Sequence, residues 1–209
     1  GVLASSVGME KVYTKIIFEK AGINQAKSIY FRKYEDKYIY IDKEFNERII
    51  GIDEVVKITI ERLDFPMFIK PSNSGSSVGI NKANNEEELK NAIIEASKFD
   101  RKILIEQGIV GKEVECAVLG KEDVISSCVG EIKAADEFYS YDAKYNNVQS
   151  KTLIPAEIPE EVAKEIQKLA IKVFKSIDGK GLARVDFFVE EKLINCPWKS
   201  NCFNRAIFL

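Results

Sequence analysis

Histidine is missing from the 209-residue sequence. Catalytic Ser-His and Cys-His pairs and histidine-ligated metal sites all need imidazole, so these residues can build none of them. The four cysteines, Cys116, Cys128, Cys196 and Cys202, form no Cys-x-x-Cys pair and show no spacing typical of metal ligands. Any chemistry must therefore rest on carboxylates, lysine, arginine, tyrosine, serine and backbone dipoles.

Long apolar runs and an excess of one charge are also missing. No stretch reaches the roughly 20 apolar residues that cross a bilayer. The 31 basic and 33 acidic residues give a formal net charge of -2, which excludes a basic nucleic-acid binder. A composition that is 45% hydrophobic and 31% charged is that of a globular protein with an ordinary core. We therefore expect neither a nucleic acid nor a membrane as a partner.

We expect no secretory leader at the start of this sequence. Its first ten residues lack a basic region followed by a long apolar core, so no secretory signal is expected. The absence of an initiator methionine indicates a processed chain or a piece of a longer one. Cys116 and Cys128 lie in apolar, strand-like runs and are expected to be reduced thiols in the core, which fits a cytoplasmic location.

The segment 68–80 reads FIKPSNSGSSVGI. Its small residues leave room for backbone N–H groups and hydroxyls to close over an anion, and Lys70 adds a positive charge. A phosphate cover and an ordinary Ser/Gly hairpin both fit this pattern. Gly75 and Gly79 lie too close together for a Walker A loop, and no helix begins directly after Gly79 as a dinucleotide fingerprint requires. A phosphate-binding loop here would be a flap between two strands.

Hydrophobic periodicity predicts helices and strands that alternate along the chain. Helices are expected over residues 10–21, 53–63, 85–96 and 159–177. Strands are expected over residues 27–41, 65–70, 101–106, 113–119, 124–132 and 181–189. Gly22 is expected to cap the first helix and Asn85 the third. Residues 133–151 read as a long loop, and no clear period remains after Asn195. The pattern predicts a mixed α/β protein with two lobes that meet near residues 107–110.

Three further motifs have polar side chains that suit a binding site. Residues 106–113 can offer backbone groups to an adenine edge and an acid to a ribose, or can be a surface linker. The aromatic loop 137–145 can close over a site and exclude water, or can pack only on itself. Arg184 and Asp186, two apart on one strand, can serve an oxyanion and a hard metal ion, or can form a simple ion pair.

In chain order these motifs resemble the D-alanine–D-alanine ligases of the ATP-grasp superfamily. The resemblance runs from residue 1 to about Asn195, through the stretches Gly1–Lys11, Ile69–Gly79, Leu104–Gly108, Val129–Ile132, Glu137–Tyr145, Ile154–Ala156 and Gly181–Phe188. It implies an α/β (α+β) ATP-grasp fold whose two lobes each combine helices with a mainly antiparallel sheet, with the nucleotide site between them. The domains would be a central lobe (1–107), a truncated C-terminal lobe (108–195) and a non-family tail (196–209).

The family implies an ATP-dependent ligase that joins two D-alanines for peptidoglycan precursors, with Mg²⁺ or Mn²⁺, and that is usually a homodimer. One D-alanine carboxylate would attack the γ-phosphate to give an acyl phosphate, and the amine of the second would displace phosphate. The resemblance implies ATP contacts for seven residues, namely Lys11, Lys70, Ser76, Glu106, Ile109, Glu113 and Lys144. The lysines and the serine would contact phosphates, and the other three the adenosine.

Four residues would act in catalysis, namely Ser76, Lys144, Tyr145 and Arg184. Lys144 would neutralise the γ-phosphate, and Tyr145 would order the closed loop through Ser76. Arg184 would stabilise the tetrahedral intermediate, and Asp186 would bind the metal. The Lys144-Tyr145 pair favours an amine acceptor over a hydroxy acid, so a D-Ala-D-Ser or another ATP-grasp carboxylate-amine ligase remains an alternative.

The sequence departs from the family at both ends. The family has an N-terminal domain ahead of residue 1, and after Asn195 it continues with Glu-Ile-Asn where this chain reads Cys196-Pro197-Trp198. A frameshift, a truncated gene or an assembly artefact would explain the change. We expect the tail to remove a strand, to leave Asp186 without partner ligands and to make the chain an inactive fragment with weak ATP affinity at most. A non-catalytic ATP-binding remnant is the remaining alternative.

Overall fold

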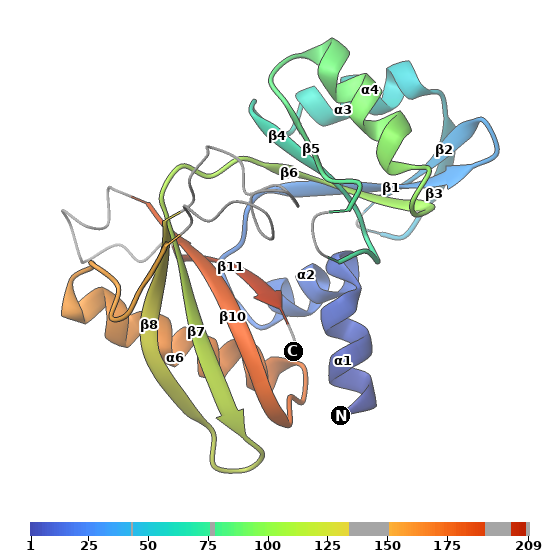
Figure 1. Ribbon diagram of the computed structural model, residues 1–209. Coiled ribbons are helices and arrows are strands. Elements are labelled where there is room, and N and C mark those ends of the chain that lie inside the picture. Colours follow the sequence, from blue (N-terminus) through green and yellow to red (C-terminus); the bar gives the residue numbers. More distant parts are fainter. Residues whose placement is uncertain (43, 76–77, 134–150, 191–201, 208–209) are drawn as a thin grey trace. The chain divides into compact units, whose positions relative to one another are not determined.

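The computed structural model describes residues 1–42, 44–75, 78–133, 151–190 and 202–207 (Figure 1). The chain divides into two compact units. One, here named the six-stranded unit, comprises residues 10–12 and 26–108. The other, here named the five-stranded unit, comprises residues 1–9, 13–25 and 109–209. Both combine helices with a sheet in which all neighbouring strands are antiparallel.

The six-stranded unit has the strand order β3-β2-β1-β6-β4-β5. Its strands are β1 (Ser28–Tyr34), β2 (Lys37–Ile41), β3 (Glu47–Ile50), β4 (Met67–Pro71), β5 (Asn81–Ala83) and β6 (Lys102–Gln107). Two helices, α3 (Ile52–Ile60) and α4 (Glu86–Ala96), complete it. The expected helices and strands of this part are confirmed, whereas the short edge strands β3 and β5 are additions that periodicity did not indicate.

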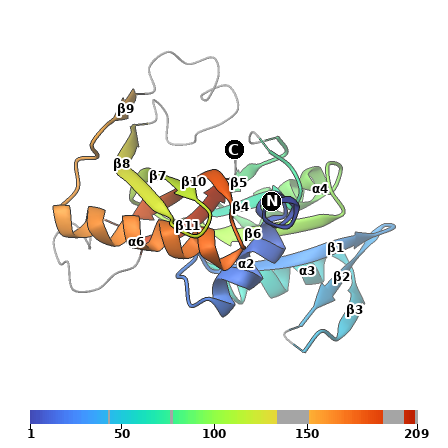
Figure 2. The ribbon, with the colours of Figure 1, turned by 90° about the horizontal axis from the view of Figure 1, so that it is seen from below.

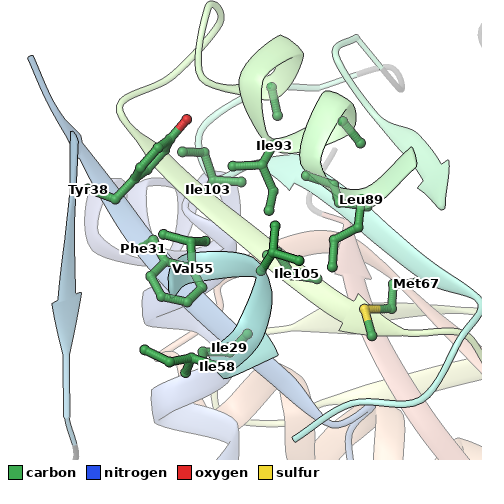
Figure 3. Packing of buried hydrophobic residues seen from close by; sticks show 14 of the residues in the cluster. Ile29, Phe31, Tyr38, Val55, Ile58, Met67, Leu89, Ile93, Ile103 and Ile105 are labelled. Carbon is green, nitrogen blue, oxygen red and sulfur yellow. The ribbon is translucent and has the colours of Figure 1, made fainter. Parts of the chain in front are cut away.

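The core of the six-stranded unit lies between its sheet and α3 and α4 (Figure 3). Alternate residues of the central strands, such as Phe31, Ile69 and Ile105, point into it and are fully buried. Each such side chain contributes about 1.5–3 kcal/mol of burial free energy. Because strand residues alternate between faces, the other face of the same strands carries Lys70 and Glu106. Burial of Ile69 and Ile105 thus fixes which face of the sheet carries Lys70 and Glu106.

The start of α4 follows the expected capping pattern. Asn85 has extended backbone angles, and its side-chain oxygen accepts a hydrogen bond from the backbone N–H of Glu88 at 2.9 Å. The Glu88 carboxylate in turn accepts bonds from the Asn84 backbone N–H and the Asn85 amide, both at 2.8 Å. The backbone N–H of Glu88 in the first turn and that of Asn84 just before the cap are satisfied in this way.

The five-stranded unit has the strand order β11-β10-β7-β8-β9. Its strands are β7 (Lys112–Gly120), β8 (Ile125–Lys133), β9 (Lys151–Leu153), β10 (Gly181–Val189) and β11 (Cys202–Ile207). Its helices are α1 (Val2–Met9), α2 (Lys11–Lys20), whose first two residues belong to the other unit, and α6 (Glu160–Ser176). The helix α6 lies along β7, β8 and β10 (Figure 2). Its buried stripe, which includes Ile166 and Val173, packs on the inner face of the sheet.

Two ends of expected helices agree closely with the structure. Gly22 has φ +63°, and the N–H of Ile23 donates to the carbonyl of Phe18 at 2.9 Å, so the expected glycine cap closes α2. Pro159 occupies the N-cap position of α6, one residue before the first turn. Helix α1, which precedes the first expected helix, was not anticipated, because only Ala4 in it is buried and no apolar stripe marks it.

Two expectations about cysteine and the tail are wrong. Cys128 is exposed, because Val129 is the residue that pairs with buried Cys116 and the preceding side chain points to the opposite face. The tail after Asn195 was expected to cost the sheet a strand, yet β11 pairs with β10 over six residues. A free β10 edge can recruit a segment whose own sequence signal is weak. Of the expected loop 133–151, the first residue ends β8 and the last begins the short strand β9, and residues 134–150 lie outside the described residues.

No helix within the described ranges combines the length and the hydrophobicity needed to cross a membrane.

Candidate functional site

The segment between β4 and β5 forms the expected flap between two strands. The hydroxyl of Ser74 donates to the Val78 carbonyl at 3.0 Å, and the Val78 N–H donates to the Gly75 carbonyl at 3.1 Å. Gly79 has φ +71°, and a Cβ there would lie 2.7 Å from Phe99 Cδ2 and 2.8 Å from Pro71 Cγ. Only glycine fits this turn without strain. Ser76 lies outside the described residues.

Lys11 lies at the base of this flap. Its ammonium donates to the carbonyl oxygens of Ser74 at 2.5 Å, Pro71 at 3.1 Å and Ser72 at 3.3 Å. Its backbone N–H also donates to the Ser72 carbonyl, at 3.1 Å. The flap therefore begins beside a fixed positive charge, although the two segments are 60 residues apart in sequence.

The buried residue Ser72 also links the base of the flap to Glu10. Ser72 is fully buried, and its hydroxyl donates to the Glu10 carboxylate. Glu10 also pairs with Lys102, whose Nζ lies 3.1 Å from Glu10 Oε1. Because both charged side chains are at most 17% exposed, this pair is shielded from solvent more than a surface ion pair is. It holds residues 10–12 on the six-stranded unit.

Lys70 and Glu106 form an ion pair on the face of the sheet away from α3 and α4. Lys70 Nζ lies 2.5 Å from Glu106 Oε2, and the side chains are 12% and 14% exposed. Phe68 lies below the ammonium, 5.8 Å from ring centroid to Nζ. The register of β4 and β6 explains this pair. Lys70 lies opposite Leu104 and Phe68 opposite Glu106, so Lys70 and Glu106 are diagonal neighbours on the same face.

In the five-stranded unit, the carboxylates of Asp186 and Glu115 contact the guanidinium of Arg184. Arg184 Nε lies 2.8 Å from Asp186 Oδ1 and 3.2 Å from Glu115 Oε2, and Nη2 lies 3.2 Å from Asp186 Oδ2. Burial by itself would lower the pKa of Arg184, but the hydrogen bond and charge of Asp186 and the charges of Glu115 and Glu113 raise it. The guanidinium is thus firmly charged, and the simple ion pair weighed for Arg-x-Asp does form.

Comparison with known proteins now identifies the family. The family profile described as "D-ala D-ala ligase C-terminus" matches residues 17–194. This chain belongs to the D-alanine–D-alanine ligase family. The D-alanine–D-alanine ligase of Acetivibrio thermocellus is 53% identical over 192 residues, which cover 92% of this chain and 48% of the relative. That of Geobacillus thermodenitrificans is 46% identical over 91% of this chain and 49% of its own length.

Solved structures confirm the ATP-grasp fold that the ligase family implies. The VanG D-Ala:D-Ser ligase from Enterococcus faecalis has a TM-score of 0.75 and 31% identity, with 99% of this chain and 52% of that chain covered. The D-alanine–D-alanine ligase from Coxiella burnetii has a TM-score of 0.76 and 27% identity, with 100% and 49% covered. The chain spans about half the length of the curated relatives it matches.

The structure places the expected ligase residues in two groups. Lys11, Lys70 and Glu106 lie in the six-stranded unit, where Lys11 contacts the base of the flap and Lys70 pairs with Glu106 on the sheet face away from α3 and α4. Ile109, Glu113, Arg184 and Asp186 lie in the five-stranded unit. Glu113 is in register with Phe188, on the same strand as Glu115. Lys144 and Tyr145 lie outside the described residues.

Sequence reasoning missed Glu115 as a neighbour of Arg184 and Asp186. Glu115 is the direct register partner of Asp186 and contacts Arg184. Its signal was present in the sequence, since Glu113 and Glu115 alternate with apolar residues on one half-buried strand. The sequence does not show that Asp186 of β10 lies opposite Glu115, because the register between the two strands is a property of the fold.

The donor set suits Mg²⁺ held partly by nucleotide phosphates. Within the described ranges no three Asp, Glu, Cys or His side chains gather as a metal site. Asp186 and Glu115 nevertheless supply hard carboxylate oxygens side by side. Mg²⁺ commonly binds through one or two carboxylates together with substrate phosphates and waters. The residues present therefore fit the metal of an ATP-dependent ligase.

Proposed function

We propose that the protein to which this chain contributes is a D-alanine–D-alanine ligase that uses ATP to join two D-alanines. The observation that carries the proposal is the group formed by Lys11, Lys70, Glu106 and the flap, in a chain 53% identical to a ligase of that name. A carboxylate is a poor electrophile, so transfer of the γ-phosphoryl group to it supplies a leaving group for the second amine. The protein supplies charge neutralisation and positioning.

The six-stranded unit would bind the nucleotide. Lys11 and Lys70 would contact ATP phosphates, together with the flap residue Ser76 and with Lys144 of the later loop. Glu106, Ile109 and Glu113 would each contact the adenosine. Because Glu106 already engages Lys70 at 2.5 Å, the ammonium is held in place before any phosphate arrives. A group ordered in advance loses less conformational entropy when it binds.

The five-stranded unit would carry the acyl-transfer chemistry. Arg184 would neutralise the oxyanion of the tetrahedral intermediate, and Tyr145 would order the closed loop through Ser76. Asp186 would hold Mg²⁺, with Glu115 beside it, and the bound ion would neutralise phosphate charge during transfer. These roles require no histidine, in agreement with the composition.

The identity of the second substrate is the main alternative. The VanG structure, named a D-Ala:D-Ser ligase, matches 99% of this chain with a TM-score of 0.75. We favour D-alanine, because the curated relatives at 42–53% identity are all named D-alanine–D-alanine ligases. We further propose a cytoplasmic location, a homodimer and a place in peptidoglycan precursor synthesis, as in that family.

A chimaera tests the proposal directly. Residues 1–194 of this chain would replace the matching half of the Acetivibrio thermocellus ligase, which then provides its own flanking segments. We expect ATP-dependent release of phosphate with D-alanine and formation of D-Ala-D-Ala, measured by mass spectrometry. D-serine offered in competition should appear in a minor product only. A folded chimaera that binds ATP but forms neither dipeptide would refute the ligase assignment.

The isolated chain provides a second measurement. Isothermal titration with ATP and MgCl₂ should give a saturable signal that Lys70→Met weakens. If the folded chain and the chimaera both fail to bind ATP, the nucleotide-binding half of the proposal is wrong as well.

A further inference from the structure

One guanidinium is shared by two carboxylates on the face of the five-stranded sheet that lies away from α6. Arg184 engages both oxygens of Asp186, at 2.8 and 3.2 Å, and one oxygen of Glu115, at 3.2 Å. The Asp186 side chain is 6% exposed and that of Glu115 is 21% exposed. Asp186 is therefore the tighter partner, and Glu115 is a second acceptor already within reach.

The strands hold the two carboxylates opposite each other. Asp186 and Glu115 are register partners in the β7–β10 pair, and directly opposed residues have Cβ atoms about 4.5–5.5 Å apart. Like charges at such positions repel unless a cation lies between them. Arg184 provides that cation from the same face of β10, two residues before Asp186.

The same arginine stands where a metal ion would compete with it. Both Asp186 oxygens accept bonds from Arg184, so a divalent cation that binds this carboxylate competes with the guanidinium for its negative charge. A guanidinium stays charged at any physiological pH, so a half-buried one needs another anion when it leaves its partner. Glu115 is a second carboxylate in contact with Arg184, and Glu113, two residues earlier on the same strand, adds its charge.

We propose that Arg184 serves as the counter-ion of Asp186 in the metal-free chain and passes to Glu115 when a divalent cation binds Asp186. Glu115 is then a positioning residue, since it keeps Arg184 beside the reacting groups while Asp186 turns to the metal. This inference rests on the proposed function, in which Asp186 is the metal ligand. No movement of the strands is needed, because Arg184 Nε already lies within contact of both acceptors.

The test measures metal binding rather than activity. Free Mn²⁺ gives a six-line electron paramagnetic resonance signal that is lost on binding, so titration of the 209-residue chain with MnCl₂ alone yields an affinity. Arg184→Gln removes the competitor and should tighten Mn²⁺ binding. Glu115→Gln should weaken it by about fivefold, the lower end of typical coupling between sites. Arg48→Gln, which breaks the exposed pair with Glu54, is the matched control and should change nothing.

The double variant separates a relay from a direct effect of charge. If Glu115 acts through Arg184, then Glu115→Gln should have less than about a twofold effect in the Arg184→Gln background. Glu115→Asp should restore Mn²⁺ binding in the wild-type background. Circular dichroism checks that each variant is folded, and Arg184→Lys, which keeps the charge but loses the fork, is a milder substitute for Arg184→Gln.

The outcomes distinguish failure of the inference from failure of the metal assignment. Equal weakening by Glu115→Gln in both backgrounds would show that Glu115 acts directly, and would overturn the relay. No tightening in either Arg184 variant would overturn it as well. If Asp186→Asn nevertheless abolishes Mn²⁺ binding, the metal site of the proposed function stands. If Asp186→Asn has no effect, both the metal assignment and the relay are wrong.

Discussion

The ammonium of Lys70 lies 2.5 Å from the carboxylate of Glu106, and the two side chains are only 12% and 14% exposed. Neither charge is a solvated surface charge, and neither belongs to the apolar core on the other face of the sheet. A pair so placed is neutral as a whole, and its ammonium is largely shielded from solvent. A phosphate that binds the Lys70 ammonium therefore has little water to displace from it.

Lys70→Met should therefore weaken ATP binding by about tenfold or more, because a hydrogen bond to a charged group contributes about 1.5–3 kcal/mol. Isothermal titration of the chain with ATP and MgCl₂ measures the change. Lys90→Met is the matched control, since Lys90 pairs with exposed Asp53 in the same unit. Equal ATP affinity in the wild type and Lys70→Met would argue against a phosphate contact at this lysine.

The flap should depend on Gly79 but not on Gly75. Gly79→Ala forces a Cβ to within 2.8 Å of Pro71 and requires an alanine at φ +71°, so we expect a loss of about 1–3 kcal/mol in the free energy of unfolding. Gly75→Ala meets no atom within 4 Å and should stay within about 0.5 kcal/mol of the wild type. Urea denaturation compares the two, and equal losses would contradict the turn geometry.

Periodic burial is what made most of the fold predictable from sequence. The stripe of α6 and the alternation in β7 and β10 each match one face of a sheet, so local pattern and tertiary packing agree. β3 and β11 are edge strands, and edge strands owe their conformation to a neighbouring ladder more than to their own residues. A short stretch of sequence does not show which strand will pair with it, so β3 and β11 could not be predicted from local pattern.

The sequence predicts those residues of the candidate site that lie within a single short motif, but not the pairs that form between motifs. Lys70, Arg184 and Asp186 stand in short, distinctive segments, and the structure places each on a strand face with a charged partner. Glu115 and Glu106 acquire their partners through register between strands far apart in sequence. One residue of slip would turn either glutamate to the other face, so no periodicity argument identifies such pairs.

The cap of α4 offers a clean test of local structure. Asn85→Ala removes the acceptor of the Glu88 N–H and should lower the free energy of unfolding by about 1 kcal/mol. Asn91→Ala, at an exposed interior position of the same helix, raises helix propensity and should not destabilise the chain. Urea midpoints of the two variants give the comparison, and similar midpoints would mean that the cap contributes little.

The Lys133–Glu157 pair should give stability a defined pH dependence. The hydrogen bond from Lys133, and then its charge, lowers the pKa of Glu157 below its ordinary 4.5. A carboxyl whose folded pKa is lowered contributes stability above its unfolded pKa and loses it as the pH falls through the folded value. The difference in urea midpoint between wild type and Lys133→Met should thus be present at pH 7 and vanish toward pH 3. Lys121→Met serves as the exposed control.

The two thiols of β7 and β8 should differ sharply in reactivity. Burial raises the pKa of Cys116 above the ordinary 9.0, and the side chain is inaccessible, whereas Cys128 is exposed. Because the thiolate is the nucleophile, less than half of Cys116 is reactive even at pH 9. Brief treatment with iodoacetamide at pH 8 should label Cys128 and leave Cys116 unmodified until urea unfolds the chain.

Peptide mapping can follow the two sites separately. Trypsin places Cys116 in the peptide 113–121 and Cys128 in the peptide 122–133, so mass spectrometry reports each labelling rate independently. Cys116→Ala should leave the labelling of Cys128 unchanged. Rapid modification of Cys116 in the native chain would mean that β7 and β8 separate under native conditions. Because β7 carries Glu115 and pairs with β10, such opening would also disturb the face on which Arg184 and Asp186 lie.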